Sequence, residues 1–525
     1  MSAALSLPPI ISDRRKRLRI IFWVFLICTS CKVLLFPSYR STDFDVHRHW
    51  KAVTRHLPVG EWYWDDQYVD TRHTLDYPPG FAWLEYAWTN NYVVSALLKH
   101  GWVDEDCFAL LSDSRDGLLQ PVTNSCIAFM RSTVIVGDMI FWVGAYAVAH
   151  VVESTFSWPT FLGLVLYPGL LWLDHVHFQY NALMIGVWLL SIAALLRANI
   201  TDREHIASYS LLGAAFLYSL LSTMKHLYLM FAPWYTIYLL RRYCHNPGKG
   251  PSFVFSFPKF IILGSMTVTT LSIPLIPMTT LSVHPVKKMM QQLHLRLFPF
   301  GRGLVHDYWA GNLWAFYAAA SRIVQLPEVT PKQTAILLLL CQSPSYWYCW
   351  KAAATRDNSL LLLSMSLCGA ASFFVSYHVH EKAILNVLVP LTLWGVQKFD
   401  RFDFWWECTA WGTMGLVPLL YEPRELLLKG ITFTCYLCAF YGYHKTHHQP
   451  VPFYTRYRKM MMYVPYRFHG FLLAAVWIMV DLIPIRAFGR FEFAPLALTS
   501  LFCAFGLTIA FIRLLYFIVT DKVIL

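Results

Sequence analysis

Residues 14–50 read RRKRLRIIFWVFLICTSCKVLLFPSYRSTDFDVHRHW. This stretch passes from a basic cluster through an apolar run, residues 21–36, to a polar segment. The run is long for the core of a signal peptide and lacks a convincing small-residue cleavage site, so we expect a retained membrane anchor. Positively charged flanks stay in the cytosol, which predicts a cytosolic N-terminus and puts the polar segment on the translocated side.

The composition of the whole chain agrees with a membrane protein. Of its 525 residues, 56% are hydrophobic and only 14% are charged, a balance too apolar for a soluble protein of this size. Apolar stretches of about twenty residues recur, the length that a helix needs to cross roughly 30 Å of hydrocarbon. The alternating pattern of a membrane barrel is absent. The sequence therefore predicts an all-α polytopic membrane protein in contact with membrane lipid.

About fourteen transmembrane helices can be placed along the chain. The short segments 155–173 and 383–397 are expected to be tilted, broken or only membrane-dipping. The expected spans are 21–36, 127–152, 155–173, 178–197, 206–224, 227–241, 253–280, 332–350, 358–377, 383–397, 404–421, 425–443, 468–486 and 493–519.

The connections between these spans differ in charge according to their side of the membrane. Alternate connections hold clusters of Arg and Lys, such as Arg241 and Arg242, which is typical of the cytosolic side. The other connections hold the clusters of acids and histidines, so we expect those clusters together on the translocated side. The net charge of +12 is thus explained by topology rather than by binding of nucleic acid. The sequon at Asn199 falls on a cytosolic connection, and we predict that it is not glycosylated.

The first loop, residues 38–126, is rich in acidic residues. It contains amphipathic stretches near 44–57 and 80–98, which we expect to lie along the membrane surface. Cys107 and Cys126 share this loop. They could form a disulfide if the loop faces an oxidising compartment, and two free thiols are the alternative.

Asp43 and Asp45 follow the first apolar run, beside two imidazoles and a guanidinium. An ionisable group next to a membrane is a candidate for function, and we take Asp43 as a candidate catalytic base. Carboxylates at these positions diverge on a helix, so the two are not expected to share a proton. In a helix beginning near Phe44, Asp43 could equally cap the helix N-terminus.

Two histidine-containing clusters, residues 174–181 and 378–382, are candidates for metal or anion binding. Neither has the helical spacing of zinc enzymes such as HExxH, so we expect no metal ion. The imidazoles, together with Lys382, Lys225 and Arg302, instead supply hydrogen-bond donors and positive charge for an anion. Their position at the membrane edge favours a lipid phosphate, and snorkelling of basic side chains to headgroups is the alternative. Motifs for nucleotide binding are absent.

Five motifs of this chain resemble, in order, those of the endoplasmic-reticulum glucosyltransferases that use dolichyl phosphate glucose. The resemblance covers roughly residues 30–395. Its details, including HVHF at 175–178 and WAGNLW at 309–314, are closer to the members that add the second glucose than to those that add the first. The five motifs are STDFDVHRHW at 41–50, TLDYPP at 74–79, DHVHFQYN at 174–181, RLFPFGRGL at 296–304 and HVHEKAIL at 378–385.

The resemblance implies a GT-C type membrane fold with its active site on the lumenal side of the endoplasmic reticulum membrane. It implies inverting transfer of glucose, in α-1,3 linkage, from dolichyl phosphate glucose to the lipid-linked oligosaccharide Glc1Man9GlcNAc2-diphosphodolichol. It also implies no obligatory metal and no other cofactor. In such a reaction one base takes the proton of the acceptor hydroxyl, while phosphate leaves without a strong general acid.

The same resemblance implies a role for Asp43, and we infer roles for the other residues of these motifs. The base of the family corresponds to the first acidic residue of the first motif, Asp43. We expect the donor phosphate to be bound by His380, Lys382, Arg302 and His378. We expect the sugar substrates, or the groups that orient them, to contact Asp45, Asp76, Asp174, His177, Gln179, Lys225 and Glu381.

Residues 1–397 are expected to form the catalytic module, with lumenal loops at 38–126 and 281–331. Residues 398–525 are expected to form a transmembrane scaffold of the same membrane domain, because the later spans are poor in polar groups. Two alternatives stay open: a first-glucose transferase acting on Man9GlcNAc2-diphosphodolichol, and a transporter or flippase for a polyprenyl-linked sugar. Transporters usually contain internal repeats, and none is evident in this sequence.

Overall fold

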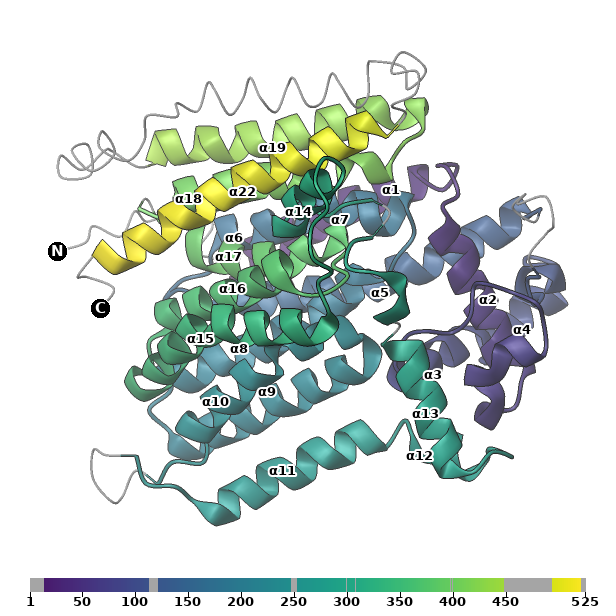
Figure 1. Cartoon of the computed structure of the whole chain (residues 1–525), viewed down its shortest axis with the longest axis horizontal. Coiled ribbons are helices and arrows are strands. Elements are labelled where there is room, and N and C mark those ends of the chain that lie inside the picture. The colour runs from purple at the N-terminus through teal and green to yellow at the C-terminus, as the bar shows by residue number, and fades with distance from the viewer. Residues whose placement is uncertain are drawn as a thin grey trace.

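The computed structural model describes residues 14–112, 121–246, 253–298, 300–306, 308–396, 398, 400–447 and 493–520. In these ranges the ordered elements are helices (Figure 1), and the extended pairings are isolated bridges, His245 with Phe255 and Val305 with Val379.

The long apolar segments form continuous helices in the positions that hydropathy predicts. Most of them begin and end within a few residues of the expected span, and α1 extends into the basic cluster that precedes it. The expected span 468–486 lies outside the described residues. The continuous helices are α1 (Arg14–Leu34), α5 (Asn124–Val151), α8 (Asn181–Ile200), α9 (Glu204–Met224), α15 (Pro331–Thr355), α16 (Asn358–Val375), α19 (Leu426–His447) and α22 (Ala494–Thr520).

The other apolar segments are interrupted. Proline explains two of the breaks, because it lacks the N–H that an inner helical turn needs: Pro168 separates α6 from α7, and Pro274 separates α11 from α12. Of the two segments expected to be tilted, broken or only membrane-dipping, 155–173 is broken, whereas 383–397 is a single short helix, α17, that directly follows the turn η8. The pieces are α6 (Trp158–Val165), α7 (Pro168–Leu170) and η4 (Leu171–Val176); η5 (His226–Phe231) and α10 (Ala232–Arg242); α11 (Phe257–Ser272) and α12 (Ile276–Thr280); η8 (Glu381–Ile384) and α17 (Leu385–Gly395); and α18 (Phe402–Met414) and η9 (Val417–Leu419).

Six of the described helices are long and apolar enough to cross a membrane. They confirm a helical membrane protein with several passes. The expected number of about fourteen is not reached by helices of this kind in the described ranges, because the interrupted segments are too short individually and because α1 and α15, although long, are not apolar enough. The six are Asn124–Val151, Asn181–Ile200, Glu204–Met224, Asn358–Val375, Pro423–His447 and Ala494–Val519.

The central bundle is built from α5, α8 and α9 on one side and from α10, α15, α16 and α17 on the other. Glycines let α5 and α8 approach closely: a Cβ on Gly186 would lie 2.5 Å from the backbone nitrogen of Phe141. Small residues at such crossings are typical of membrane helices, where backbone proximity maximises van der Waals contact.

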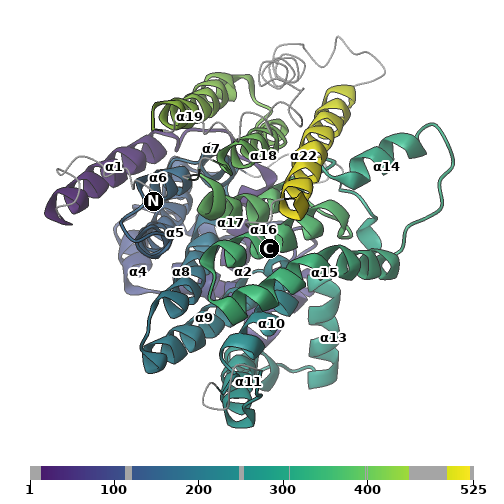
Figure 2. The ribbon, with the colours of Figure 1, turned by 90° about the vertical axis from the view of Figure 1, so that its left-hand side faces the viewer.

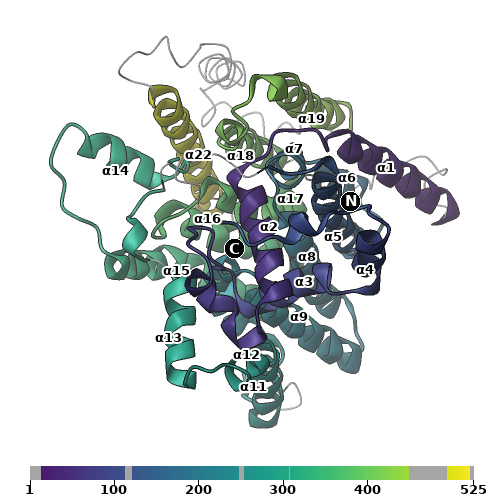
Figure 3. The same cartoon turned by 90° about the vertical axis from the view of Figure 1, so that its right-hand side faces the viewer.

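Shorter helices in the connections cover one end of this bundle. Figure 1 shows α2, α3 and α4 gathered there, and Figure 3, which looks onto that end, shows α2 lying across its middle. Figure 2 shows the molecule from the opposite end, with α9, α10 and α15. The connecting helices are α2 (Thr42–His56), η2 (Val59–Gln67), α3 (Pro79–Thr89), α4 (Tyr92–Lys99), η3 (Glu105–Phe108), α13 (Val286–Leu297), η7 (Phe300–Arg302), α14 (Leu313–Ser321) and η10 (Pro423–Glu425).

Helix α2 does not lie along a surface, which corrects the expectation for residues 44–57. Its residues from Phe44 to Thr54 are almost all buried. The Lys51 Nζ donates hydrogen bonds to Glu85 Oε2 at 2.5 Å and to the Tyr180 hydroxyl at 2.8 Å, and all three side chains are buried. Charged residues on several faces gave this segment its amphipathic appearance, but their partners lie inside the protein.

The first loop is closed by a disulfide between Cys107 and Cys126, whose Cα atoms are 5.3 Å apart. This decides between the two alternatives left open by the sequence. The bond ties η3 to the start of α5.

The C-terminal part of the chain reaches the end of the bundle that carries α2. The Tyr39 hydroxyl donates to the carbonyl oxygen of Leu419 at 2.6 Å. Farther along, Arg513 of α22 pairs with Glu407 of α18 at 2.6 Å. The C-terminal segment expected to be scaffold therefore contacts the first loop, through Leu419 and Tyr39.

Candidate active site

Asp43 lies in the first turn of α2, and groups from two other segments, residues 174–181 and 378–382, meet at its Oδ2 atom. The Lys382 Nζ donates to this oxygen at 2.7 Å, the Gln179 Nε2 donates to it as well, and the His177 Nε2 lies 3.3 Å away. The side chain keeps 28% of its surface exposed. No hydrogen bond from the described residues reaches Oδ1, so one carboxylate oxygen is fixed and the other is open.

Asp43 does not cap its helix. The helix begins at Thr42 with Ser41 at the N-cap position, and the side chains at this end make no capping hydrogen bond. The capping hypothesis is therefore wrong. Asp43 still lies in the first turn, where the helix dipole favours a negative charge.

His177 is held in one tautomer by Tyr39. Because the Tyr39 hydroxyl donates its proton to the Leu419 carbonyl, it accepts a hydrogen bond from His177 Nδ1–H at 2.7 Å. The Nε2 atom of His177 is then an acceptor, and the Lys382 Nζ donates to it at 3.2 Å. Lys382 thus bridges His177 and Asp43.

Asp174 orients the side chains that contact Asp43. It is fully buried, its Oδ2 accepts from the backbone N–H of Ala182 at 2.6 Å, and its Oδ1 accepts from Asn181 Nδ2 at 2.9 Å. Asn181 Nδ2 also donates to Gln179 Oε1 at 2.8 Å, and Lys225 Nζ donates to Asn181 Oδ1 at 2.9 Å. A continuous chain of hydrogen bonds therefore links Asp174 and Lys225 to Asp43.

The backbone around His177 is fixed by a buried arginine. Arg131 of α5 donates to the carbonyl oxygens of His175, Val176 and Tyr39. Phe178, next to His177, has a φ of 79°, which is uncommon for a bulky residue. Such strained positions persist where the surroundings determine them, and here the turn points His177 and Gln179 toward Asp43.

The loop at 300–306 docks on the loop at 378–382. The His378 N–H donates to the Leu304 carbonyl, and the His378 Nδ1–H donates to the Gly303 carbonyl, both at 2.9 Å. This pairing brings the rings of His306 and His380 to 4.1 Å between centroids. His378, with a φ of 51°, is a second strained residue at this end.

His306, His380 and Glu381 have ligand atoms within 4.8 Å of one another and so could hold a metal ion. Glu381 is buried, and its Oε2 has no hydrogen-bond partner among the described residues. No helical zinc spacing is visible in the sequence, because His306 comes from a different loop. Three ligands that leave a position open would suit a catalytic metal, and equally two imidazoles and a protonated carboxyl can donate hydrogen bonds to an anion.

Asp76 and Arg302 form the outer part of the site. The Arg302 Nη2 lies 3.4 Å from Asp76 Oδ2, and the Arg302 side chain is 53% exposed. Burial raises the pKa of Asp76 to about 6, although Arg302 opposes this shift.

Burial and neighbouring charges set the protonation of the central groups. Burial by itself would raise the pKa of Asp43, but the Lys382 ammonium opposes this effect, and the pKa lies well below its usual range. Burial raises the pKa of Asp174 to about 7 and lowers the pKa of Lys225 to about 8, the latter with help from Lys382. Burial and His306 lower the pKa of His380.

Asp45 is the sequence-predicted residue that this arrangement leaves apart. Its buried side chain lies 3.4 Å from Arg40 Nε and faces away from Asp43, as two residues on a helix must. The sequence reasoning missed Tyr39, Asn181 and His306. Asn181 stands within a quoted motif, whereas Tyr39 and His306 carry no local signal.

Comparison with known proteins supports one family. The model of the "ALG6, ALG8 glycosyltransferase family" matches residues 28–514. Proteins named "Dolichyl pyrophosphate Glc1Man9GlcNAc2 alpha-1,3-glucosyltransferase" are similar to this chain. The Bos taurus protein is 31% identical, with 94% of both chains covered; that of Schizosaccharomyces pombe is 31% identical, with 96% of this chain and 99% of the relative covered; that of Arabidopsis thaliana is 33% identical, with 80% of both covered. This chain belongs to the ALG6, ALG8 glycosyltransferase family.

Proposed function

We propose that this chain is an inverting α-1,3-glucosyltransferase that moves glucose from dolichyl phosphate glucose to Glc1Man9GlcNAc2-diphosphodolichol. The observation that carries the proposal is the Asp43 carboxylate, with Oδ2 held by Lys382 and Gln179 and with Oδ1 open. The names of the relatives support an acceptor that already bears one glucose, so the second-glucose reaction is favoured over the first-glucose alternative.

In the proposed reaction Asp43 Oδ1 accepts the proton of the acceptor hydroxyl. The hydroxyl oxygen attacks C1 of the donor glucose from the face opposite the phosphate, and the bond from C1 to the phosphate oxygen breaks. The electron pair of that bond leaves with dolichyl phosphate. A positioned base contributes typically 10²- to 10⁴-fold to such a step.

Lys382 links donor binding to the strength of the base. With Lys382 paired to it, Asp43 has a low pKa and is a weak base. A donor phosphate beside Lys382 would interact with the Lys382 ammonium and weaken its effect on Asp43. The effect of burial would then prevail, and the pKa of Asp43 would rise. Asp43 would become a stronger base only when donor is present.

The remaining cations and imidazoles would hold the donor phosphate. Lys382, His380 and His378 lie on one loop, and docking of the 300–306 loop brings Arg302 and His306 near it. Arg302 is exposed and only weakly paired with Asp76, so its planar guanidinium can turn to a phosphate and bind it bidentately.

We propose that these groups do the work of charge stabilisation without an obligatory metal. A chelator should then leave transfer unchanged. If chelation abolishes transfer and zinc, manganese or magnesium restores it, His306, His380 and Glu381 hold a metal and this part of the proposal is wrong.

We propose a GT-C type fold in which interrupted helices combine to complete about fourteen crossings of the endoplasmic reticulum membrane. The N-terminus would be cytosolic and Asp43 lumenal, which agrees with a disulfide in the same loop. The sequon residue Asn199 would be cytosolic, and its side chain is already bonded to Asn358 and Tyr238. Digestion with an N-glycosidase should therefore cause no mass shift. A shift would show that Asn199 is lumenal and that the orientation is the opposite of the one proposed.

The decisive experiment uses purified protein, dolichyl phosphate glucose and lipid-linked acceptors with no glucose or with one. We expect product only from the monoglucosylated acceptor. Product from the unglucosylated acceptor alone would support the first-glucose alternative. Movement of a lipid-linked sugar across the membrane of vesicles that contain the protein, without any glucosyl transfer, would support a transporter.

Replacement of Asp43 tests the base. We expect Asp43→Asn to lower the rate of transfer by at least roughly 10²-fold while donor binding and folding are kept. Asp45→Asn is the matched control, because Asp45 lies on the same helix but faces Arg40, and it should cost less than about tenfold. Normal transfer by Asp43→Asn would remove Asp43 as the base.

A further inference from the structure

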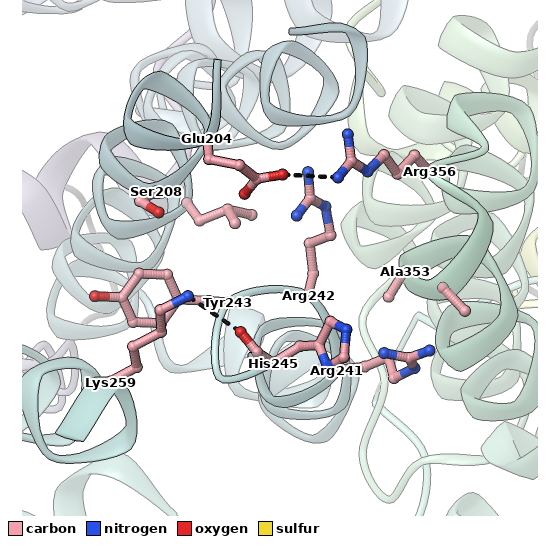
Figure 4. A pocket seen from close by; sticks show the side chains of 11 residues that line it. Glu204, Ser208, Arg241, Arg242, Tyr243, His245, Lys259, Ala353 and Arg356 are labelled. Carbon is pink, nitrogen blue, oxygen red and sulfur yellow. Dashed lines mark hydrogen bonds and ion pairs between the residues drawn. The ribbon is translucent and has the colours of Figure 1, made fainter. Parts of the chain in front are cut away.

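A polar cavity lies at the opposite end of the bundle from Asp43. Its volume is about 210 Å³, and it opens between α9, α10, α15 and the start of α11. Figure 4 shows basic side chains converging on it from several of these helices. The charged and titratable residues that line it are Arg241, Arg242, Arg356, Lys259, His245, Tyr243 and Glu204.

Positive charge in this cavity exceeds negative charge. Glu204 is the only acid among the lining residues, and Arg356 Nη2 already pairs with it at 2.8 Å. Arg242 Nη2 donates to the Ala198 carbonyl at 3.0 Å, while the buried Nε atoms of Arg241 and Arg242 have no hydrogen-bond partner among the described residues. Two guanidinium groups therefore keep donor capacity beside the cavity.

Aromatic rings orient Arg241 without neutralising it. Its guanidinium carbon lies 5.2 Å from the ring centroid of Phe253 and 5.4 Å from that of Trp350. Such cation–π contacts fix a guanidinium while leaving its edge free to bind an anion. Lys259 is placed by a hydrogen bond to the His245 carbonyl at 3.1 Å.

The cavity adjoins an apolar surface. Helix α11 starts beside it and exposes Phe257 at 64% and Ile262 at 51%, and Trp350 of α15 is 38% exposed. Exposed aromatic and aliphatic side chains next to basic groups are typical of the boundary between hydrocarbon and water. A ligand that spans both surfaces would have an anionic head and an apolar tail.

The length of α9 separates this cavity from the candidate active site. The helix starts at Glu204, which lines the cavity, and ends at Met224, next to Lys225 of the Asp43 network. Its 21 residues span about 31 Å at 1.5 Å each, close to the thickness of the hydrocarbon core. The two sites therefore lie at opposite membrane surfaces.

We propose that this cavity binds the phosphate of an anionic phospholipid in the leaflet opposite the Asp43 site. Arginine forks bind phosphate oxygens bidentately, and basic pockets between membrane helices recognise lipid headgroups. A free phosphate shares this headgroup chemistry, but it makes no use of the apolar surface of α11. The site is separate from the proposed transfer reaction. If Asp43 is lumenal, as proposed above, the leaflet is the cytosolic one, and only this identification of the leaflet rests on the proposed function.

The test uses the purified full-length protein in mixed micelles of detergent and phosphatidylcholine. Phosphatidic acid carrying a fluorophore on its tail is titrated, and anisotropy reports binding. We expect saturable binding that weakens at least tenfold in Arg241→Gln/Arg356→Gln and also in Lys259→Gln/Arg356→Gln. Arg197→Gln/Arg203→Gln, which removes exposed charges at the same end outside the cavity, should change affinity less than twofold.

Competition distinguishes the sources of phosphate. Unlabelled phosphatidic acid should displace the probe, and phosphatidylcholine and inorganic phosphate should not. Displacement by inorganic phosphate as effective as that by phosphatidic acid, or unchanged binding in both cavity variants, would overturn the proposal. The melting temperature in phosphatidylcholine and the rate of glucose transfer serve as folding controls. The variants should keep both, with a rate of transfer within threefold of that of the unchanged protein. The binding readout holds whether or not the proposed glucosyl transfer is correct.

Discussion

Asp43 differs from Asp45 in its partners rather than in its chemistry. Both are carboxylates on the first turn of α2, but the helix directs them to different neighbours. Asp43 meets Lys382 and Gln179, and Asp45 meets Arg40. The pairing with Lys382 keeps the pKa of Asp43 low and so keeps its carboxylate unprotonated.

The charge of Lys225 is expected to make donor binding depend on pH. Burial and Lys382 lower its pKa to about 8, so its ammonium is charged below pH 8 and loses its proton above it. If this charge attracts the donor phosphate, the KM for donor should rise by roughly tenfold between pH 7 and pH 9, the loss of about 1.4 kcal/mol. Steady-state kinetics over this range would measure the change.

Lys225→Arg is the control, because arginine stays charged over the whole range. Its KM for donor should vary little with pH. Identical pH profiles for the two proteins would assign the wild-type profile to another group.

At the scale of elements, the site is built from breaks in helices. His177 follows the π-helical turn η4, Lys225 precedes η5, and Lys382 lies in η8. Each of these pieces replaces a continuous membrane helix. Irregular backbone at a membrane is tolerated where it is buried in protein or lines a cavity, and here the interruptions direct polar side chains toward Asp43.

Helix α2 is held beneath the site by the buried pair of Lys51 and Glu85. Removal of Lys51 leaves the buried charge of Glu85 with only the hydrogen bond from His47 Nδ1 to its Oε1 at 2.8 Å, a loss of up to about 3–5 kcal/mol. We expect Lys51→Met to lower the melting temperature of the detergent-solubilised protein clearly. Lys51→Met/Glu85→Met should recover much of the loss, because no unpaired charge is then buried.

Lys398→Met provides the matched comparison. Lys398 pairs with Glu153 at 2.6 Å, but the Lys398 side chain is 44% exposed, and exposed pairs contribute about 0–1 kcal/mol. The melting temperature should change little. A double variant of Lys51 and Glu85 as unstable as the single variant would show that α2 depends on something other than this ion pair.

At the scale of the whole molecule, the two ends of the bundle differ in chemistry. The Asp43 end combines acids, histidines and lysines, and the opposite end carries the arginine-rich cavity. The first loop covers the former end and is closed by the disulfide between Cys107 and Cys126.

The disulfide gives a prediction for the intact protein. Two of the twelve cysteines are paired, and ten are free. Alkylation of denatured, unreduced protein from membranes should therefore add ten labels by mass spectrometry, and reduction beforehand should add two more. Twelve labels without reduction would show that the loop does not reside in an oxidising compartment.

The sequence by itself determined the class of fold and the positions of the long continuous helices. A helix that crosses lipid must satisfy its own backbone and present about twenty apolar residues, a local property that is visible in one chain. It also assigned Asp43, His177, Gln179 and Lys382 as candidates through local motifs.

Only the tertiary structure decided which of these groups meet. Lys382 is 339 positions from Asp43, and Gln179 is 136; such contacts depend on packing that hydropathy does not encode. The same applies to Tyr39, which sets the tautomer of His177, and to His306, which joins His380 from another loop. Burial of α2 was also invisible in the sequence, because charged residues look solvent-exposed until their partners are known.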